Sequence, residues 1–136
     1  MFASHSSCRA LANVRRNMTD EMIRALAKKG GVMQINFSCG FIKQGSSLTN
    51  SRPTLADVVK HINHAVGTGG IDAVGLGSDF DGISCAPVNL AGVQDWPNLT
   101  RALLEEGYSA AEIRKIYGGN TLRLMEAVER AARPVR

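Results

Sequence analysis

The residues best suited to chemistry are concentrated in a glycine-rich segment, residues 75–82, which carries the carboxylates Asp79 and Asp81. A phosphate-binding loop is one interpretation, but the full dinucleotide fingerprint and its opening helix are missing. A calcium loop is a second, but the later oxygen ligands and the distal glutamate of an EF-hand are absent. The pattern alone leaves two interpretations open: a catalytic carboxylate at a strand end beside a metal, and a tight turn with a capping aspartate.

Two basic residues near the amino end could also take part in a site. His5 follows a short apolar stretch that could be the end of a strand, and a neutral imidazole there suits a divalent metal. Arg16 carries a planar guanidinium that matches the geometry of a carboxylate. A lone histidine is more often hydrogen bonded within the fold or exposed to solvent than bound to a metal. A lone arginine is more often a solvated surface residue than a carboxylate-binding one.

A pair of histidines, His61 and His64, is spaced three residues apart in a predicted helix, so both lie near the same face. A helical histidine pair can bind zinc, but no acidic residue or third histidine is close in sequence. We therefore interpret His61 and His64 as a surface pair and not as a metal site.

The three cysteines, Cys8, Cys39 and Cys85, are odd in number and widely spaced. Such a set is neither a disulfide framework nor a zinc ribbon. We expect all three to be free thiols in a reducing compartment, and we expect a cytoplasmic protein because no signal peptide is readable.

Strands and helices alternate along the chain, as the hydrophobic periodicity and the capping signals indicate. The predicted strands are residues 1–4, 32–37 and 71–77. The predicted helices begin after Thr19, Pro53, Trp96, Ser109 and Asn120. This order predicts an α/β fold with parallel strands. His5, Asn36 and Asp79 lie at or near predicted carboxyl ends of strands, which form the functional face of such folds.

The composition excludes several classes of protein. The chain has 136 residues, 44% of them hydrophobic and 21% charged, with a net charge of +4. These fractions are typical of a globular chain, and no apolar stretch approaches the roughly 18 residues of a membrane span. A nucleic-acid partner is not expected, because the basic residues are scattered and only 5% of residues are aromatic.

Taken in order, five segments resemble the membrane (renal) dipeptidase family of zinc metallopeptidases. These segments are residues 2–7, 15–17, 32–37, 75–82 and 118–123. The likeness runs over almost the whole chain but covers only the C-terminal part of a family member. We therefore expect residues 1–136 to form a single partial domain, the C-terminal portion of a (β/α)8 TIM-like barrel of the metal-dependent hydrolase type.

The resemblance implies a function and assigns roles. Family members hydrolyse dipeptides with water activated by two zinc ions. The resemblance implies that His5 is a zinc ligand, that Arg16 binds the substrate's C-terminal carboxylate, and that Asp79 handles protons near the water. Asp81 and Asn120 match family positions that we interpret as structural. His61 and His64 match a family helix whose histidines are not ligands.

The remaining ligands of the family, a His-x-Asp motif, a bridging glutamate and another histidine, have no counterpart in this sequence. A zinc site needs at least three or four protein ligands. We therefore expect the chain alone to lack dipeptidase activity and tight zinc binding. A separate N-terminal portion of the barrel, or a homo-oligomer partner, could complete the site. The alternative hypothesis is a non-catalytic α/β assembly or binding module.

Overall fold

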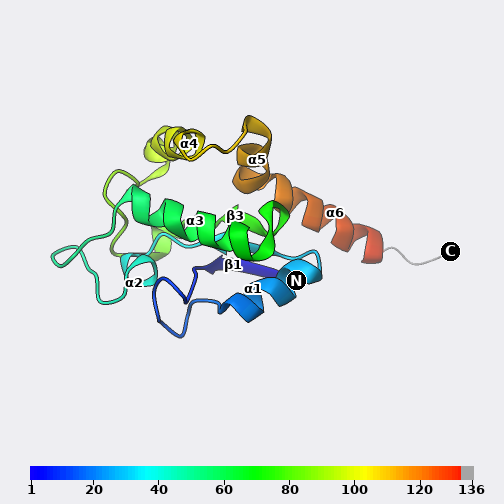
Figure 1. The fold of residues 1–136 in the computed structure, drawn as a ribbon, viewed down its shortest axis with the longest axis horizontal. Coiled ribbons are helices and arrows are strands. Elements are labelled where there is room, and N and C mark those ends of the chain that lie inside the picture. Colours follow the sequence, from blue (N-terminus) through cyan, green and yellow to red (C-terminus); the bar gives the residue numbers. More distant parts are fainter. Residues whose placement is uncertain (133–136) are drawn as a thin grey trace.

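The computed structural model describes residues 1–132, which contain one parallel three-stranded sheet (Figure 1). Its strands are β1 (Phe2–Ser6), β2 (Val32–Ile35) and β3 (Val74–Leu76), in the order β1-β2-β3. Both pairings are parallel, so the three carboxyl ends lie at one edge of the sheet. The predicted α/β class is confirmed.

Helices connect the strands and follow the last one. They are α1 (Asp20–Lys28), α2 (Cys39–Ile42), α3 (Leu55–Gly69), α4 (Trp96–Glu105), α5 (Ala110–Arg114) and α6 (Asn120–Ala132). Short 3-10 turns occur at Ile71–Ala73, Phe80–Gly82 and Val93–Asp95, and a π-type turn at Lys115–Gly119 joins α5 to α6.

Side-chain caps fix the starts of three helices where the sequence predicts them. The Thr19 side chain accepts a hydrogen bond from a backbone amide in the first turn of α1. The Asp57 carboxylate accepts from the backbone amide of Thr54 at 2.9 Å, and Glu112 accepts from that of Ser109 at 2.8 Å. Each cap satisfies an amide that the helix itself leaves without a partner.

The two faces of the sheet are covered differently. Met33 and Ile35 are fully buried on the face that packs against α1 and α3, and this layer forms the hydrophobic core. Gln34 points to the other face, where its amide donates to the hydroxyl of Thr121 at the start of α6. The last turns of α6 project past the other helices (Figure 1).

Three predicted elements differ from the observed ones. The strand expected at residues 71–77 is a 3-10 turn followed by the three residues of β3, because the chain turns sharply at Gly70, whose φ is 85°. β1 continues to Ser6, which pairs with Ile35, so His5 lies within the strand and not after it. The expected loop after β2 contains α2.

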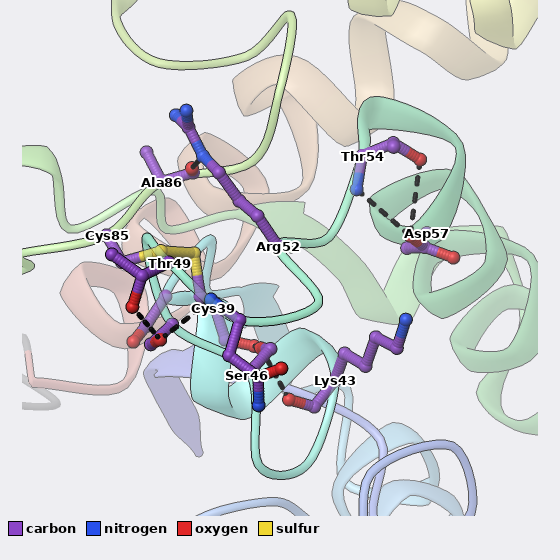
Figure 2. The surroundings of a disulfide bond; sticks show 12 residues. Cys39, Lys43, Ser46, Thr49, Arg52, Thr54, Asp57, Cys85 and Ala86 are labelled. Carbon is purple, nitrogen blue, oxygen red and sulfur yellow. Dashed lines mark hydrogen bonds between the residues drawn. A yellow bond between two sulfur atoms is a disulfide. The ribbon is translucent and has the colours of Figure 1, made fainter.

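A disulfide joins Cys39 to Cys85, so the expectation of three free thiols is wrong (Figure 2). The two cysteines lie 46 residues apart in sequence, but the loops after β2 and β3 run side by side, and the Cys39 amide donates to the Cys85 carbonyl at 3.0 Å. Only Cys8 is a free thiol, and it is buried. The inference of a reducing compartment rested on free thiols and loses that support.

Among residues 1–132, no helix is both long enough and apolar enough to cross a bilayer.

Candidate active site

His5 presents its imidazole near the carboxyl end of β1 and is bonded at both ring nitrogens. The Nδ1 atom lies 2.8 Å from the Ser4 hydroxyl, and the Nε2 atom lies 2.6 Å from a guanidinium nitrogen of Arg16. Because the guanidinium can only donate, Nε2 accepts with its lone pair and Nδ1 carries the proton. The lone pair that a metal would use is therefore directed at Arg16.

Arg16 belongs to a loop that hydrogen bonds hold firmly against β1. The side chain of Arg9 donates to the carbonyls of Asn17 and Arg15, and the hydroxyl of Ser6 donates to the carbonyl of Arg16. The guanidinium itself is exposed, and it lies 5.9 Å from the ring centre of Phe41. A fixed backbone with an accessible guanidinium suits the binding of an anionic group.

Asp79 follows β3 and is held by Asn36, which directly follows the neighbouring strand β2. The Asn36 amide donates to Oδ2 of Asp79 at 3.1 Å, while Oδ1 of Asn36 accepts from the amide of Ser38 at 2.6 Å. Asn36 is fully buried and its backbone amide donates to Ser6 at the end of β1. Asn36 therefore connects the ends of all three strands.

The backbone at Asp79 also suits a fixed carboxylate. Its φ is 65°, in the left-handed region that aspartate tolerates better than most residues. The next residue, Phe80, packs edge-on against Phe37 at 5.7 Å between ring centres. The Cys39–Cys85 disulfide ties the same two loops together further along the chain.

The described residues do not by themselves form a metal centre. Within residues 1–132, no three His, Cys, Asp or Glu side chains lie close enough to hold a metal ion. Of the three predicted site residues, the structure joins His5 to Arg16 directly; no hydrogen bond links Asp79 to either of them in this part of the chain. The zinc ions implied by the resemblance therefore do not fit these residues alone.

The histidines of α3 have structural partners. The buried His61 accepts from the Cys8 amide at Nδ1 and bonds the Ile42 carbonyl through Nε2, and burial lowers its pKa. His64 bonds Asp20 at 2.7 Å. The expectation of a surface pair is wrong for His61, because the loop carrying Cys8 covers it.

Asn120 has the structural role that was expected of it. Its buried amide donates to the carbonyls of Ile71 and Val74, at 2.7 and 2.8 Å, and so anchors the start of α6 to the amino end of β3. Asp81 is exposed within the 3-10 turn that follows Asp79.

Comparison with known proteins identifies the family. Residues 1–136 match the family model described as membrane dipeptidase (peptidase family M19). The chain belongs to the membrane dipeptidase family. Dipeptidase ataJ of Aspergillus terreus is 39% identical over 129 residues, which are 95% of this chain and 31% of that protein. An uncharacterised protein from the pqqA 5′ region of Klebsiella pneumoniae is 36% identical over 128 residues, which are 94% of this chain and 46% of that protein.

Solved structures of family members have the same local fold. A metallopeptidase called dipeptidase AC, of peptidase family M19, superposes on this chain with a TM-score of 0.84 and 31% sequence identity. The superposition covers 92% of this chain and 36% of dipeptidase AC. A metallopeptidase from Rhodobacter sphaeroides, liganded with a phosphinate mimic of the dipeptide L-Ala-D-Ala, gives the same TM-score and identity over 35% of its chain. The chain thus spans a third to a half of its relatives' length.

These matches confirm the predicted family, and the α/β unit matches about a third of each of those two chains. Sequence reasoning placed Asn36 at a strand end but gave it no role, and it missed Ser4 as the partner of His5. The sequence does carry a signal for Asn36. Residues 32–37 are apolar except for Gln34 and Asn36, which are two residues apart and so share one face of an extended segment.

Proposed function

We propose that this chain forms part of the active site of a zinc-dependent dipeptidase and is the C-terminal portion of its (β/α)8 barrel. The observation that carries the proposal is the family match over residues 1–136, together with His5 and Asp79 near the carboxyl ends of β1 and β3 and Arg16 hydrogen bonded to His5. Dipeptides are the proposed substrates because relatives of this chain are dipeptidases.

Each residue of the proposed site has one role. The exposed Arg16 guanidinium binds the free carboxylate of the dipeptide, which selects short peptides. Asp79, held through Oδ2 by Asn36, accepts a proton from the attacking water and passes it to the leaving amine. His5 offers its Nε2 lone pair as one metal ligand.

The metal itself requires ligands from outside the described residues. His5 is one ligand where at least three or four are needed, and no sufficient cluster occurs in residues 1–132. The isolated chain is therefore inactive and binds zinc weakly. The complete site forms when the rest of the barrel contributes its own side chains.

A fusion protein tests this proposal. The segment that precedes the matched region in dipeptidase ataJ is joined to residues 1–136, and dipeptide hydrolysis is measured with added zinc. We expect the fusion to hydrolyse dipeptides and its Asp79→Asn variant to lose most of that activity. A non-catalytic assembly module would show no turnover in either protein, and its assembly would be unchanged by Asp79→Asn.

A further inference from the structure

Gly82 lies directly against the Asp79 carboxylate, three residues further along the chain. A Cβ atom at position 82 would overlap Oδ1 of Asp79 and would lie 3.2 Å from the carboxylate carbon. The Asp79 side chain therefore occupies the space that any residue other than glycine would fill at this position. The backbone of Gly82 is not in the left-handed region, so glycine is required here for space and not for conformation.

The turn that carries Gly82 is anchored to the rest of the fold. The Gly82 amide donates to the Asp79 carbonyl at 2.9 Å, which closes the turn. Phe80, inside this turn, packs edge-on against Phe37, and the Phe37 amide donates to the Ser78 carbonyl at 3.3 Å. A methyl group at position 82 would therefore displace the Asp79 side chain, because the backbone is held while the half-buried carboxylate can rotate.

Asn36 fixes the other oxygen of the same carboxylate. It is fully buried, and its own orientation is set because its Oδ1 accepts from the Ser38 amide at 2.6 Å. The amide nitrogen of Asn36 therefore faces Oδ2 of Asp79, to which it donates at 3.1 Å. Oδ2 is held by Asn36 and Oδ1 lies over Gly82, and among residues 1–132 no hydrogen bond occupies Oδ1.

We propose that Asn36 and Gly82 are positioning residues for Asp79, which hold its carboxylate so that Oδ1 is left to take up the proton. This inference rests on the proposed function of Asp79. Proton transfer needs the accepting oxygen within hydrogen-bond reach of the donor, and a displacement of about 1 Å can lower the rate about 100-fold. Gly82 acts by being small and Asn36 by donating to Oδ2, so neither residue needs to touch the substrate.

Gly82→Ala tests the space requirement in the fusion to the preceding segment of dipeptidase ataJ. The three atoms nearest to the added methyl all belong to the Asp79 carboxylate, so the variant should fold with an unchanged unfolding temperature. We expect kcat to fall about 10- to 100-fold, with KM changed by less than about twofold.

Gly40→Ala is the matched control for this variant. It adds a methyl to α2, in the neighbouring loop, at a position where no other atom lies within 4 Å. We expect Gly40→Ala to retain the kcat of the parent fusion. Equal kcat values for Gly82→Ala and Gly40→Ala would overturn the proposal.

A double variant separates positioning from a general structural effect on the loop. If the methyl acts only through the carboxylate, Gly82→Ala should cause no further loss of kcat in a fusion that already carries Asp79→Asn. A loss of the same size in both backgrounds would assign the effect to the loop and overturn the proposal.

Asn36→Asp tests the hydrogen-bond donor. It keeps the shape of the side chain and the oxygen that accepts from Ser38, but it removes the donor to Asp79. We expect kcat of the fusion to fall by a factor similar to that of Gly82→Ala. Urea unfolding identifies a variant that has lost its fold, in which case Asn36→Ser takes its place. Full kcat in a folded Asn36 variant would overturn the role of Asn36.

The isolated chain allows a test that needs no activity. Heteronuclear NMR of the Asn36 side-chain amide protons reports their hydrogen bond to Asp79. We expect Gly82→Ala and Asp79→Ala to shift these signals upfield to a similar extent, because both variants remove the acceptor, and Gly40→Ala to leave them in place. Unchanged signals in Gly82→Ala would overturn the proposal. An inactive parent fusion would reject the proposed function alone, because these signals would still show whether Gly82 places Asp79.

Discussion

The guanidinium of Arg16 lies 2.6 Å from Nε2 of His5, the nitrogen whose lone pair would bind a metal. The residue proposed to bind substrate and the residue proposed to bind metal thus bind each other in this chain. Because the guanidinium can only donate, Nδ1 carries the ring proton and donates to the Ser4 hydroxyl at 2.8 Å. In the proposed metal-bound state, Arg16 would have to turn away from Nε2 so that the lone pair faces the metal.

Replacing Arg16 tests its role in substrate binding. In the active fusion, Arg16→Met should lower kcat/KM for dipeptides by about 10- to 100-fold, mainly through KM, since a hydrogen-bonded charge pair contributes about 1.5–3 kcal/mol. The neighbouring exposed residue Arg15 provides the control, because its backbone carbonyl, not its side chain, holds the loop. Equal losses for Arg15→Met and Arg16→Met would mean that general surface charge binds the substrate.

Asp79→Asn tests the proton-transfer role. Proton transfer by a positioned side chain contributes about 10²- to 10⁴-fold, so kcat of the fusion should fall by that factor with little change in thermal stability. Asp81→Asn is the matched control, because Asp81 is an exposed carboxylate two residues away. Steady-state kinetics of both variants distinguish the roles; a larger loss for Asp81→Asn would reverse the assignment.

His61 should make stability depend on pH. Burial lowers its pKa in the folded chain, so below the unfolded pKa of about 6.5 the unfolded state binds a proton that the folded state does not. The free energy of unfolding, measured with urea, should therefore decrease as pH falls from about 6.5 to 5. His61→Gln should flatten this slope. If His61→Gln left the slope unchanged, the pH dependence of the free energy of unfolding would come from another group.

Thiol titration tests the disulfide directly. Burial raises the pKa of Cys8 to about 12, so the native chain should not react with DTNB near pH 8. Without reductant the denatured chain should give one reactive thiol, because Cys39 and Cys85 are bonded, and after reduction it should give all three. Three reactive thiols in the unreduced, denatured chain would show that Cys39 and Cys85 are free.

The disulfide should also contribute to stability. Closing a loop between residues 46 apart restricts the unfolded chain, which corresponds to about 4 kcal/mol in the chain-entropy treatment. The double variant Cys39→Ser/Cys85→Ser should lose free energy of unfolding up to that amount. Treating the variant and the parent with reductant provides the control, since reduction should destabilise only the parent.

Local elements could be predicted from the sequence because their causes are local. Thr19, Thr54 and Ser109 cap helices within three residues of themselves, and the apolar spacing of residues 55–66 requires an amphipathic helix. The α/β class followed from the alternation of these elements. The parallel topology in turn placed His5, Asn36 and Asp79 at one edge of the sheet before any contact was known.

The contacts that complete the site could not be predicted in the same way. Asn36 meets Asp79 across 43 residues and Cys39 meets Cys85 across 46, and neither pairing leaves a periodic signal in the sequence. The burial of His61 depends on the Cys8 loop folding over it from 53 residues away. These contacts depend on how distant segments pack in the folded chain. The spacing of residues within one helix or strand carries no information about that packing.

We propose that this chain supplies one side of a dipeptidase site and needs the rest of the barrel to act. The most direct test is dipeptide hydrolysis, with added zinc, by the isolated 136-residue chain and by its fusion to the preceding segment of dipeptidase ataJ. We expect the fusion to hydrolyse dipeptides, its Asp79→Asn variant to lose that activity, and the isolated chain to show none. Hydrolysis by the isolated chain, or full activity of the Asp79→Asn fusion, would contradict it.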